Sequence, residues 1–354
     1  MIPKEVLDAF LFSPDACKIS RFGNGLIHET YLLEVRNQRY LLQKLNHRVF
    51  KDLVGVMSNI TSVLDFLHHS GTNYSGLQFL SAMSGSNLVL TNNEYWRAMI
   101  FIDNSISHEK IQNSKQAFEA GKIVGDFHSK LSNFESHSLV HTIPHFHDFQ
   151  NRLTHLNEAA KNDIVKRKSN VEPLLDYLIT ISDYIINNKY ENELPTRVTH
   201  NDTKLNNILF DSTDTAICLV DFDTLMPGKI TFDTGDALRT MCNPAGEDGS
   251  HGVVEFRTEY FYQFTKGYIQ QGRGLLKNEE LAAIPFSIIR MTVEQAIRFL
   301  TDYLEGDVYY HQPYEGFNFN GVKAQVQFSK LLKDMMADLE HITHELIEAE
   351  SISY

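Results

Sequence analysis

Hydrophobic and polar positions follow two different periods along the chain, which predicts two parts of different build. Residues 17–45 contain the short β-prone runs CKISRF, YLLEV and YLLQKL, separated by turn residues and by a polar RNQR segment. Residues 49–68 place apolar side chains at helical spacing and stop at Gly71, as a glycine at a helix end permits. A further pair of strands is expected around NNEYW, with residues 95–102 as its second member.

The rest of the chain has a predominantly helical pattern. Two short apolar strands interrupt it, RVTH at 197–200 and AICLVDF at 216–222. Helical spacing is found in six ranges: 113–131, 146–164, 171–188, 252–272, 278–304 and 321–349. We therefore predict an α+β fold with two lobes. An N-terminal β-rich lobe covers residues 1–103, a larger and mostly helical lobe covers residues 104–354, and a hinge near 99–103 joins them.

The strongest chemical signal is the segment VTHNDTKLNNILFDSTDTAICLVDFDT at 198–224. Asp202 follows a short strand, Asn207 lies five residues later, and a second apolar strand leads to Asp221. Carboxylate and amide oxygens are the ligands that Mg²⁺ prefers, and Mg²⁺ often keeps phosphate oxygens in its remaining positions. The spacing matches a kinase catalytic loop and its downstream metal-binding aspartate. The structural alternative makes Asp202 a helix cap and Asp221 a polar strand end.

Kinase chemistry also needs a cover and a cation for the nucleotide phosphates. Gly23-Asn24-Gly25 lies between the first two strands, where glycines let backbone N–H groups approach phosphate; an ordinary hairpin loop is the alternative. Lys44 ends the third strand on the same face as Tyr40 and Leu42, so we expect its tip to reach the cleft; a surface lysine is the alternative. The chain has no GxxxxGK[ST] motif, which excludes a P-loop enzyme.

Five segments spread over most of the chain share their pattern with one family of enzymes. They are FGNGLIHETYLLEV at 22–35, YLLQKLN at 40–46, HNDTKLNNILFD at 200–211, DFDTLMPGKITFDTGDALR at 221–239 and RFLTDYLEGDVYY at 298–310. On these segments the chain resembles the aminoglycoside phosphotransferase-like family of small-molecule kinases, which have a bilobal protein-kinase-like fold. Within that family it is most similar to the N-acetylhexosamine 1-kinases. The last two segments favour the sugar kinases.

The resemblance implies a role for each residue of the motifs. Asp202 is implied as the base that orients and deprotonates the sugar hydroxyl, and it thereby also contacts the substrate. Asn207 and Asp221 are implied as Mg²⁺ ligands, and Lys44 is implied as the residue on the α- and β-phosphates of ATP. Lys204 resembles a lysine that many protein kinases place near the γ-phosphate, where its charge offsets that of the transferring group.

The connection between the lobes and one missing acid complete the expected nucleotide site. The resemblance alone places adenine against Met99 and Phe101; a plain buried strand is the alternative. Residues 35–93 contain no glutamate, so the acid that usually pairs with the strand lysine from the following helix is missing. A shorter carboxylate could substitute for it, and the candidates are Asp52 and Asp65.

Two helical segments offer candidate substrate contacts. Asp236 and Arg239 lie three residues apart on one helix face, which indicates an ion pair or a sugar contact. A stripe of alternating charge follows at i,i+4 spacing in an otherwise apolar helix: Arg290, Glu294, Arg298 and Asp302. Such a stripe is typical of a salt-bridged surface, and here it could instead face a polar cleft. Arg298 and Asp302 are the leading candidates, because they offer donors and an acceptor for sugar hydroxyls and an acetamide.

Composition narrows the classes of function. The 32 Lys and Arg against 45 Asp and Glu give a charge of −13, which argues against general binding of nucleic acid or anionic membranes. Three scattered cysteines fit a reducing compartment. The N-terminal segment lacks the features of a signal peptide, and no apolar stretch approaches the roughly 20 residues of a membrane span. We therefore expect a cytoplasmic protein with a core of ordinary size.

These observations together predict an ATP- and Mg²⁺-dependent kinase that phosphorylates the anomeric C1 hydroxyl of N-acetylglucosamine or N-acetylgalactosamine. One alternative is a kinase for another small alcohol of the choline, homoserine or aminoglycoside type. A second is a nucleotide-binding protein that has lost transfer activity, which the missing glutamate suggests. A third is a metal-dependent hydrolase built on His145-Phe146-His147-Asp148, although this segment is more typical of a helix N-terminus.

Overall fold

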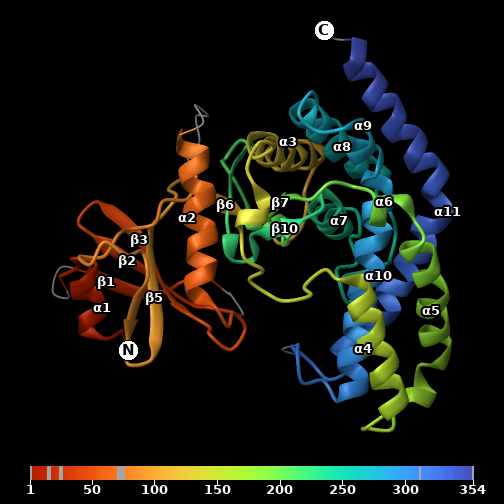
Figure 1. The fold of residues 1–354 in the computed structure, drawn as a ribbon, viewed down its shortest axis with the longest axis horizontal. Coiled ribbons are helices and arrows are strands. Elements are labelled where there is room, and N and C mark those ends of the chain that lie inside the picture. Colours follow the sequence, from red (N-terminus) through yellow and green to blue (C-terminus); the bar gives the residue numbers. More distant parts are fainter. Residues whose placement is uncertain (1, 14–16, 24–26, 70–75, 311, 353–354) are drawn as a thin grey trace.

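The structure has a small sheet near the N-terminus and a larger helical part (Figure 1). It is a computed structural model, and it describes residues 2–13, 17–23, 27–69, 76–310 and 312–352. Asn24, Gly25 and Gly71, which the sequence analysis singles out, lie outside the described residues. The predicted α+β class is confirmed, whereas the exact boundaries of the two lobes stay a prediction.

The N-terminal sheet is antiparallel and has the strand order β1-β2-β3-β5-β4. Its strands are β1 (Cys17–Arg21), β2 (Glu29–Val35), β3 (Gln38–Leu45), β4 (Val89–Thr91) and β5 (Glu94–Ile100). These strands agree with the predicted β-prone runs. Because successive residues of a strand point to opposite faces, the register of β3 decides which of its side chains can face the rest of the protein.

Each face of the sheet is covered by one helix. Leu42 and Trp96 pack with α1 (Lys4–Ala9) in a small apolar cluster. Leu45, on the other face, packs with α2 (Leu53–His69) in the main core. Figure 1 shows α2 between the sheet and the helical part. The α2 face is therefore the one through which the sheet meets the rest of the protein.

The helical part is built mainly on the helices that the periodicity predicts. Its helices are α3 (Ser114–Lys130), α4 (Phe149–Asn162), α5 (Glu172–Ile186), α6 (Lys189–Asn192), α7 (Ile230–Met241), α8 (Thr258–Gly272), α9 (Asn278–Ala282), α10 (Ile284–Glu305) and α11 (Phe317–Ile352). The single helix predicted over 278–304 is two helices, because Pro285 favours a helix start rather than a helix interior. The helical ranges predicted from the sequence do not include α7, in which the charged residues Asp233, Asp236 and Arg239 are buried together with apolar ones.

Glycines let α3 and α8 pack against each other at close range. A Cβ atom on Gly121 of α3 would lie 2.0 Å from the carbonyl oxygen of Phe264. A Cβ atom on Gly267 of α8 would lie 2.2 Å from the carbonyl oxygen of Phe118. Both positions therefore require glycine, and the resulting contact fixes α3 beneath the short strands described next.

Two small sheets connect the N-terminal sheet with the helices. The strands β7 (Arg197–Thr199) and β10 (Met226–Gly228) pair with each other, and β6 (Ile106–Ser107), β8 (Ile208–Phe210) and β9 (Ala216–Leu219) form the second sheet. In Figure 1 they lie between α2 and α7. The turns that leave β7 and β9 carry Asp202 and Asp221. In the described part of the chain, no helix has the length and hydrophobicity that crossing a membrane would require.

Candidate active site

The carboxylate of Asp233, on α7, anchors the loop that follows β7. Its carboxylate accepts hydrogen bonds from the backbone N–H groups of His200 and Asn201, at 2.8 and 2.6 Å. His128 of α3 also contacts this carboxylate, with its Nε2 2.8 Å away. Asn201 adopts the left-handed backbone conformation, with φ of 66°. These contacts turn the chain sharply after β7 and fix the position of the next residue, Asp202.

Asp202, Lys204 and Asn207 form one hydrogen-bonded group on this loop. The side-chain amide of Asn207 donates to the carbonyl oxygen of Asp202 at 2.8 Å and to its carboxylate Oδ2 at 3.0 Å. The Nζ of Lys204 lies 3.2 Å from the other carboxylate oxygen. Burial tends to raise the pKa of Asp202, but the charges of Lys204 and His200 and the hydrogen bonds from Lys204 and Asn207 together outweigh it, and the pKa falls below the ordinary value. Asp202 is therefore an ionised acceptor.

The hairpin of β8 and β9 brings Asp221 next to this group. The backbone N–H of Val220 donates to the carbonyl oxygen of Asn207 at 2.9 Å, which makes Asn207, just before β8, and Asp221, just after β9, close neighbours. Burial, together with the charges of Asp223 and Asp202, raises the pKa of Asp221 to about 7. The structure thus brings together Asp202, Asn207 and Asp221, which lie far apart in the sequence.

These side chains suit a divalent cation. Among the described residues, the Asp221 carboxylate has no hydrogen-bond or ion-pair partner; the atoms packed around it limit its hydration, yet part of the residue still reaches solvent. Because both amide hydrogens of Asn207 are used on Asp202, its Oδ1 oxygen stays available as an acceptor. A cation between Asp221 and Asn207 would relieve the repulsion between Asp221 and its acidic neighbours. The donor set is of the hard oxygen type that Mg²⁺ binds.

Lys44 does not lie where the sequence analysis expects it. It shares the face of Tyr40 and Leu42, as predicted, but this face packs toward α1 and points away from α2 and Asp221. Its Nζ lies 3.3 Å from Glu29 and 3.1 Å from Glu94. The expectation that Lys44 reaches the nucleotide is therefore wrong, because the period of a strand defines its faces but not which face meets the partner lobe.

Neither of the acids expected to pair with Lys44 does so in the structure. Asp52 accepts a hydrogen bond from the backbone N–H of Gly55 at 2.8 Å and so caps the start of α2. Asp65 is exposed on the same helix. The charged group that the sheet does direct toward the segment carrying Asp221 is Arg97 of β5, which pairs with Asp223. The sequence analysis missed Arg97, although a lone arginine within the apolar run EYWRAMI was a usable signal.

The residues expected to hold adenine lie on β5 and just beyond it. Met99 is buried against α2, and the backbone N–H of Phe101 donates to the carbonyl oxygen of Arg39 at 3.0 Å. The ring of Phe101 meets Phe22 edge to face, with 5.5 Å between the ring centroids. Gly23 follows Phe22 and has a φ of 72°, a conformation that favours glycine. Gly23 therefore lies beside the connection between sheet and helices. Contact with adenine stays a prediction.

Asp236 and Arg239 form the ion pair that their spacing indicates, with 2.8 Å between Oδ1 and NH2. The same NH2 lies 2.6 Å from Oε1 of Glu247, a residue that the sequence analysis missed. The charges of Glu247 and Asp236 also act on Lys204, so this buried pair adjoins the loop with Asp202 and Lys204. The pair was predictable because its members lie three residues apart on one helix. Glu247 lies in the irregular loop after α7, where no periodic pattern indicates its contact with Arg239.

Arg298 and Asp302 differ in role although both lie on α10. The guanidinium of Arg298 lies over the rings of Phe146 and Tyr310, at 5.2 and 5.7 Å from their centroids. Asp302 is buried, and its carboxylate accepts hydrogen bonds from the backbone N–H groups of 308–310 and from the amide of Asn318. The expectation that Asp302 contacts the substrate is therefore wrong, because both oxygens of its carboxylate accept hydrogen bonds that hold the loop after α10.

The HFHD segment is a helix start. Asp148 caps α4 by accepting the backbone N–H of Asn151 at 3.0 Å, and it also pairs with His145 at 2.8 Å. His147 is buried, with its Nδ1 2.7 Å from Glu294. In the described part of the chain, no three side chains of His, Cys, Asp or Glu are arranged to hold a metal ion. The hydrolase alternative therefore has no support in the segment that suggested it.

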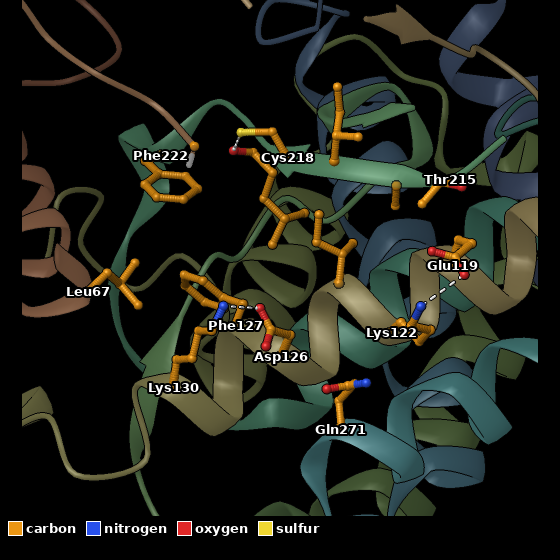
Figure 2. A pocket seen from close by; sticks show the side chains of 15 residues that line it. Leu67, Glu119, Lys122, Asp126, Phe127, Lys130, Thr215, Cys218, Phe222 and Gln271 are labelled. Carbon is orange, nitrogen blue, oxygen red and sulfur yellow. Dashed lines mark hydrogen bonds and ion pairs between the residues drawn. The ribbon is translucent and has the colours of Figure 1, made fainter. Parts of the chain in front are cut away.

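A separate cavity of about 300 Å³ lies behind β9 (Figure 2). Phe127 and Phe222 form part of its apolar wall, and ion pairs of Lys122 with Glu119 and of Lys130 with Asp126 line its polar side. None of the residues predicted to bind nucleotide, metal or substrate lines this cavity. It is thus distinct from the group formed by Asp202, Asn207 and Asp221.

Comparison with known proteins agrees with this geometry. Residues 18–268 match the sequence model of the phosphotransferase enzyme family. An aminoglycoside phosphotransferase from Alicyclobacillus acidocaldarius subsp. acidocaldarius DSM 446 has a similar structure, with a TM-score of 0.69 at 13% identity over 98% of this chain and 97% of that chain. A microcompartment-associated aminopropanol kinase gives 0.60 at 13% identity, covering 95% of this chain and 97% of that one. An ADP-bound aminoglycoside phosphotransferase gives 0.55 at 14% identity, covering 98% and 99%.

At these identities the solved structures show a common fold, and they confirm the expected bilobal, protein-kinase-like architecture. The match to the family model extends from β1 into α8, so it includes the loop with Asp202 and the turn with Asp221. It covers more than half of the 354 residues. The chain therefore belongs to the phosphotransferase enzyme family, and it is a phosphotransferase.

Proposed function

We propose that this phosphotransferase transfers the γ-phosphoryl group of ATP to the anomeric C1 hydroxyl of N-acetylglucosamine or N-acetylgalactosamine. The use of ATP is supported by the ADP that a structural neighbour binds and by the kinase-like arrangement of Asp202, Asn207 and Asp221. The choice of a neutral sugar rests on the charges around Asp202. The choice of the C1 hydroxyl rests on the resemblance to N-acetylhexosamine 1-kinases.

The observation that carries the proposal is that the charges beside Asp202 are balanced. Lys204 pairs with Asp202, and Arg239 pairs with both Asp236 and Glu247. A cationic substrate needs unpaired acids or an aromatic cage around its charge. Here Asp202, Asp236 and Glu247 are already paired with bases, and Arg298 adds a further positive charge. Such a surface favours a neutral ligand with many hydroxyl groups over an amine.

Arg298 is the candidate contact that best suits an acetamidosugar. Its guanidinium offers several donors in one plane, which complements hydroxyl and carbonyl oxygens. The rings of Phe146 and Tyr310 beside it offer apolar surface to the C–H groups of a sugar ring. Asp236 and Arg239 are buried and paired, so we assign them a supporting role behind Lys204 and Glu247.

In the proposed reaction, the chain aligns the sugar and neutralises the transferring group. The ionised carboxylate of Asp202 accepts a hydrogen bond from the attacking hydroxyl and takes its proton as the phosphoryl group leaves ATP. Lys204 holds Asp202 in place and places positive charge near the phosphoryl oxygens. Asn207 and Asp221 would hold Mg²⁺, which when bound would supply positive charge to offset that of the phosphates.

The second candidate is a kinase for another small alcohol that carries an amine. Its support is the fold shared with the aminopropanol kinase and the aminoglycoside phosphotransferases. The acids of the site are the feature that would serve such a substrate, since Asp236 and Glu247 could rearrange to meet an ammonium group. Their existing pairing with Arg239 argues against this.

A panel of acceptors tests the two candidates directly. ADP release would be measured with N-acetylglucosamine, N-acetylgalactosamine, glucose, choline, 1-amino-2-propanol and kanamycin at equal concentration. The sugar proposal expects turnover with the two acetamidosugars and a phosphorus NMR signal coupled to the anomeric proton of the product. Turnover with amines alone would reject it. The Asp202→Asn variant serves as the control for ADP that is released by a contaminating enzyme.

A further inference from the structure

Asp223, two residues beyond Asp221, connects the segment 221–224 to the N-terminal sheet. Arg97 of β5 grips its carboxylate with both terminal nitrogens, and the NH2 group lies 2.9 Å from Oδ2. The Nε2 of His28, which precedes β2, lies 2.5 Å from the same oxygen. The side chains of Arg97 and Asp223 are each 2% exposed, so solvent hardly reaches this contact.

Both partners of Asp223 are themselves held in place by the sheet. The Nε of Arg97 donates to Oε1 of Gln43 at 2.8 Å, from the neighbouring position on β3. The backbone N–H of Asn46 donates to Nδ1 of His28 at 3.0 Å. Because Nδ1 accepts a hydrogen bond, the proton of a neutral His28 must lie on Nε2, which then donates to Asp223. The contacts with Gln43 and Asn46 thus orient Arg97 and His28 toward Asp223.

In the kinase template, a lysine of the third strand pairs with a glutamate of the following helix and thereby ties the sheet to the nucleotide phosphates. Neither member has this place here. The position of β3 that faces α2 is Gln43, since Lys44 points the other way. In α2, Asn59 points to the backbone and bonds the carbonyl oxygens of Val140 and Leu225, each at 2.8 Å.

We propose that Arg97 is a positioning residue for the nucleotide, and that its ion pair with Asp223 takes the place of the strand-lysine and helix-glutamate pair. The pair runs from the sheet directly to the segment that carries Asp221. It neutralises a second carboxylate beside Asp221, where the nucleotide phosphates would otherwise meet two negative charges. It also fixes, through Asp223, the position of His28, which lies just before β2.

This inference goes beyond the proposed function, because it concerns the nucleotide and holds for any acceptor. Removing Arg97 would leave Asp223 buried, charged and without its strongest partner. The sheet would then no longer hold the segment that carries Asp221 in position. The unpaired negative charge of Asp223 would repel the nucleotide phosphates. Affinity for the nucleotide should fall, while affinity for the acceptor, which binds on the side of Lys204 and Arg298, should not.

Calorimetric titration with ADP in the presence of Mg²⁺ tests the proposal without any acceptor. We expect Arg97→Gln to weaken ADP binding by roughly tenfold or more, as loss of a charge-assisted bidentate contact implies. Lys44→Gln is the matched control, since it removes one positive charge from the opposite face of the same sheet and should change ADP affinity by less than about twofold. Arg97→Lys should fall between them, because lysine keeps the charge but not the two parallel bonds.

Two further measurements separate positioning from a loss of fold. The KM for ATP of Arg97→Gln should rise while the KM for the acceptor changes by less than about twofold. In a double-mutant cycle, Arg97→Gln with Asp223→Asn should bind ADP no more weakly than Arg97→Gln alone, because the two residues act as one unit.

Unchanged ADP affinity in Arg97→Gln, or an equal loss in Lys44→Gln, would overturn the proposal. Additive losses in the double-mutant cycle would also overturn it. If Arg97→Gln proves unfolded by circular dichroism, Arg97→Lys decides the matter: reduced ADP affinity with a native spectrum supports the positioning role, and native affinity rejects it.

Discussion

Asn207 donates both hydrogens of its side-chain amide to Asp202, at 2.8 Å to the carbonyl oxygen and at 3.0 Å to the carboxylate. The same contact therefore orients the proposed base and turns the Oδ1 oxygen of Asn207 away from it. One residue thus connects the acceptor side of the site with the proposed cation side. Changes at Asn207 should act on both, which distinguishes it from a simple ligand.

Replacement of Asn207 should raise the need for magnesium and lower turnover together. We expect Asn207→Ala to shift the Mg²⁺ concentration for half-maximal activity upward by roughly tenfold or more, since a lost metal ligand or its support commonly costs that much. Excess Mg²⁺ should restore only part of kcat, because Asp202 also loses its hydrogen bonds. Activity measured across a Mg²⁺ series checks this.

The matched control is Asn206→Ala. Asn206 is exposed, and its recorded contact is a backbone carbonyl oxygen that accepts from Ser107, so its side chain is dispensable in this arrangement. Its Mg²⁺ dependence should equal that of the unchanged protein. A normal Mg²⁺ series for Asn207→Ala would contradict the proposed cation site.

Replacement of Asp202 should remove turnover and leave nucleotide binding intact. The Asp202→Asn side chain fits the same space but cannot take a proton from the acceptor hydroxyl. We expect kcat to fall by roughly 100- to 10,000-fold, the usual contribution of a positioned general base. ADP affinity, measured by calorimetry, should change little because Asn207 and Asp221 remain. Turnover near the original rate would show that Asp202 is not the base.

The parts of the site that could be predicted are those encoded over short distances in sequence. Asp202 and Asn207 lie on one loop, and the β8–β9 hairpin is formed by neighbouring residues, so a local pattern also contains Asp221. The pairing of Arg97 with Asp223 joins residues 126 positions apart, and nothing local to either residue encodes it. Such contacts depend on how the sheet docks, which single-sequence periodicity does not determine.

The two errors of the sequence analysis have a common physical cause. Alternation along β3 correctly grouped Lys44 with its apolar neighbours, and helical spacing correctly grouped Asp302 with Arg298. Neither rule says what a face packs against. The face with Lys44 packs against α1, and Asp302 turns into the loop after α10. The helix α7 lies outside the predicted helical ranges, and its buried side chains include charged as well as apolar residues.

Replacement of Asp302 should weaken acceptor binding through the loop that it holds. In Asp302→Ala the backbone N–H groups of 308–310 lose their acceptor, so the loop beside Arg298 becomes less ordered. We expect KM for the acceptor to rise while KM for ATP stays constant, and the free energy of unfolding to fall by about 3 kcal/mol. Steady-state kinetics and urea unfolding check the two effects.

Glu305→Ala, an exposed change at the end of the same helix, is the control and should alter neither. An unchanged acceptor KM in Asp302→Ala would show that the loop does not serve the acceptor site.

The contribution of Glu247 to stability should disappear in acid. Burial raises the pKa of this carboxyl group, but the attraction of Arg239 and Lys204 prevails and lowers it from 4.5 to about 2. A carboxyl pKa that is lower in the folded state means that the folded protein favours the charged form. The resulting stabilisation is complete above about pH 4.5 and is lost as the pH falls toward 2.

The difference in melting temperature between the unchanged protein and Glu247→Gln should therefore be largest near neutral pH and shrink below pH 4.5. Glu345→Gln, an exposed change in α11 beside His341, should show no such trend. A difference for Glu247→Gln that stays constant through the acid range would mean that its ion pair with Arg239 does not stabilise the site.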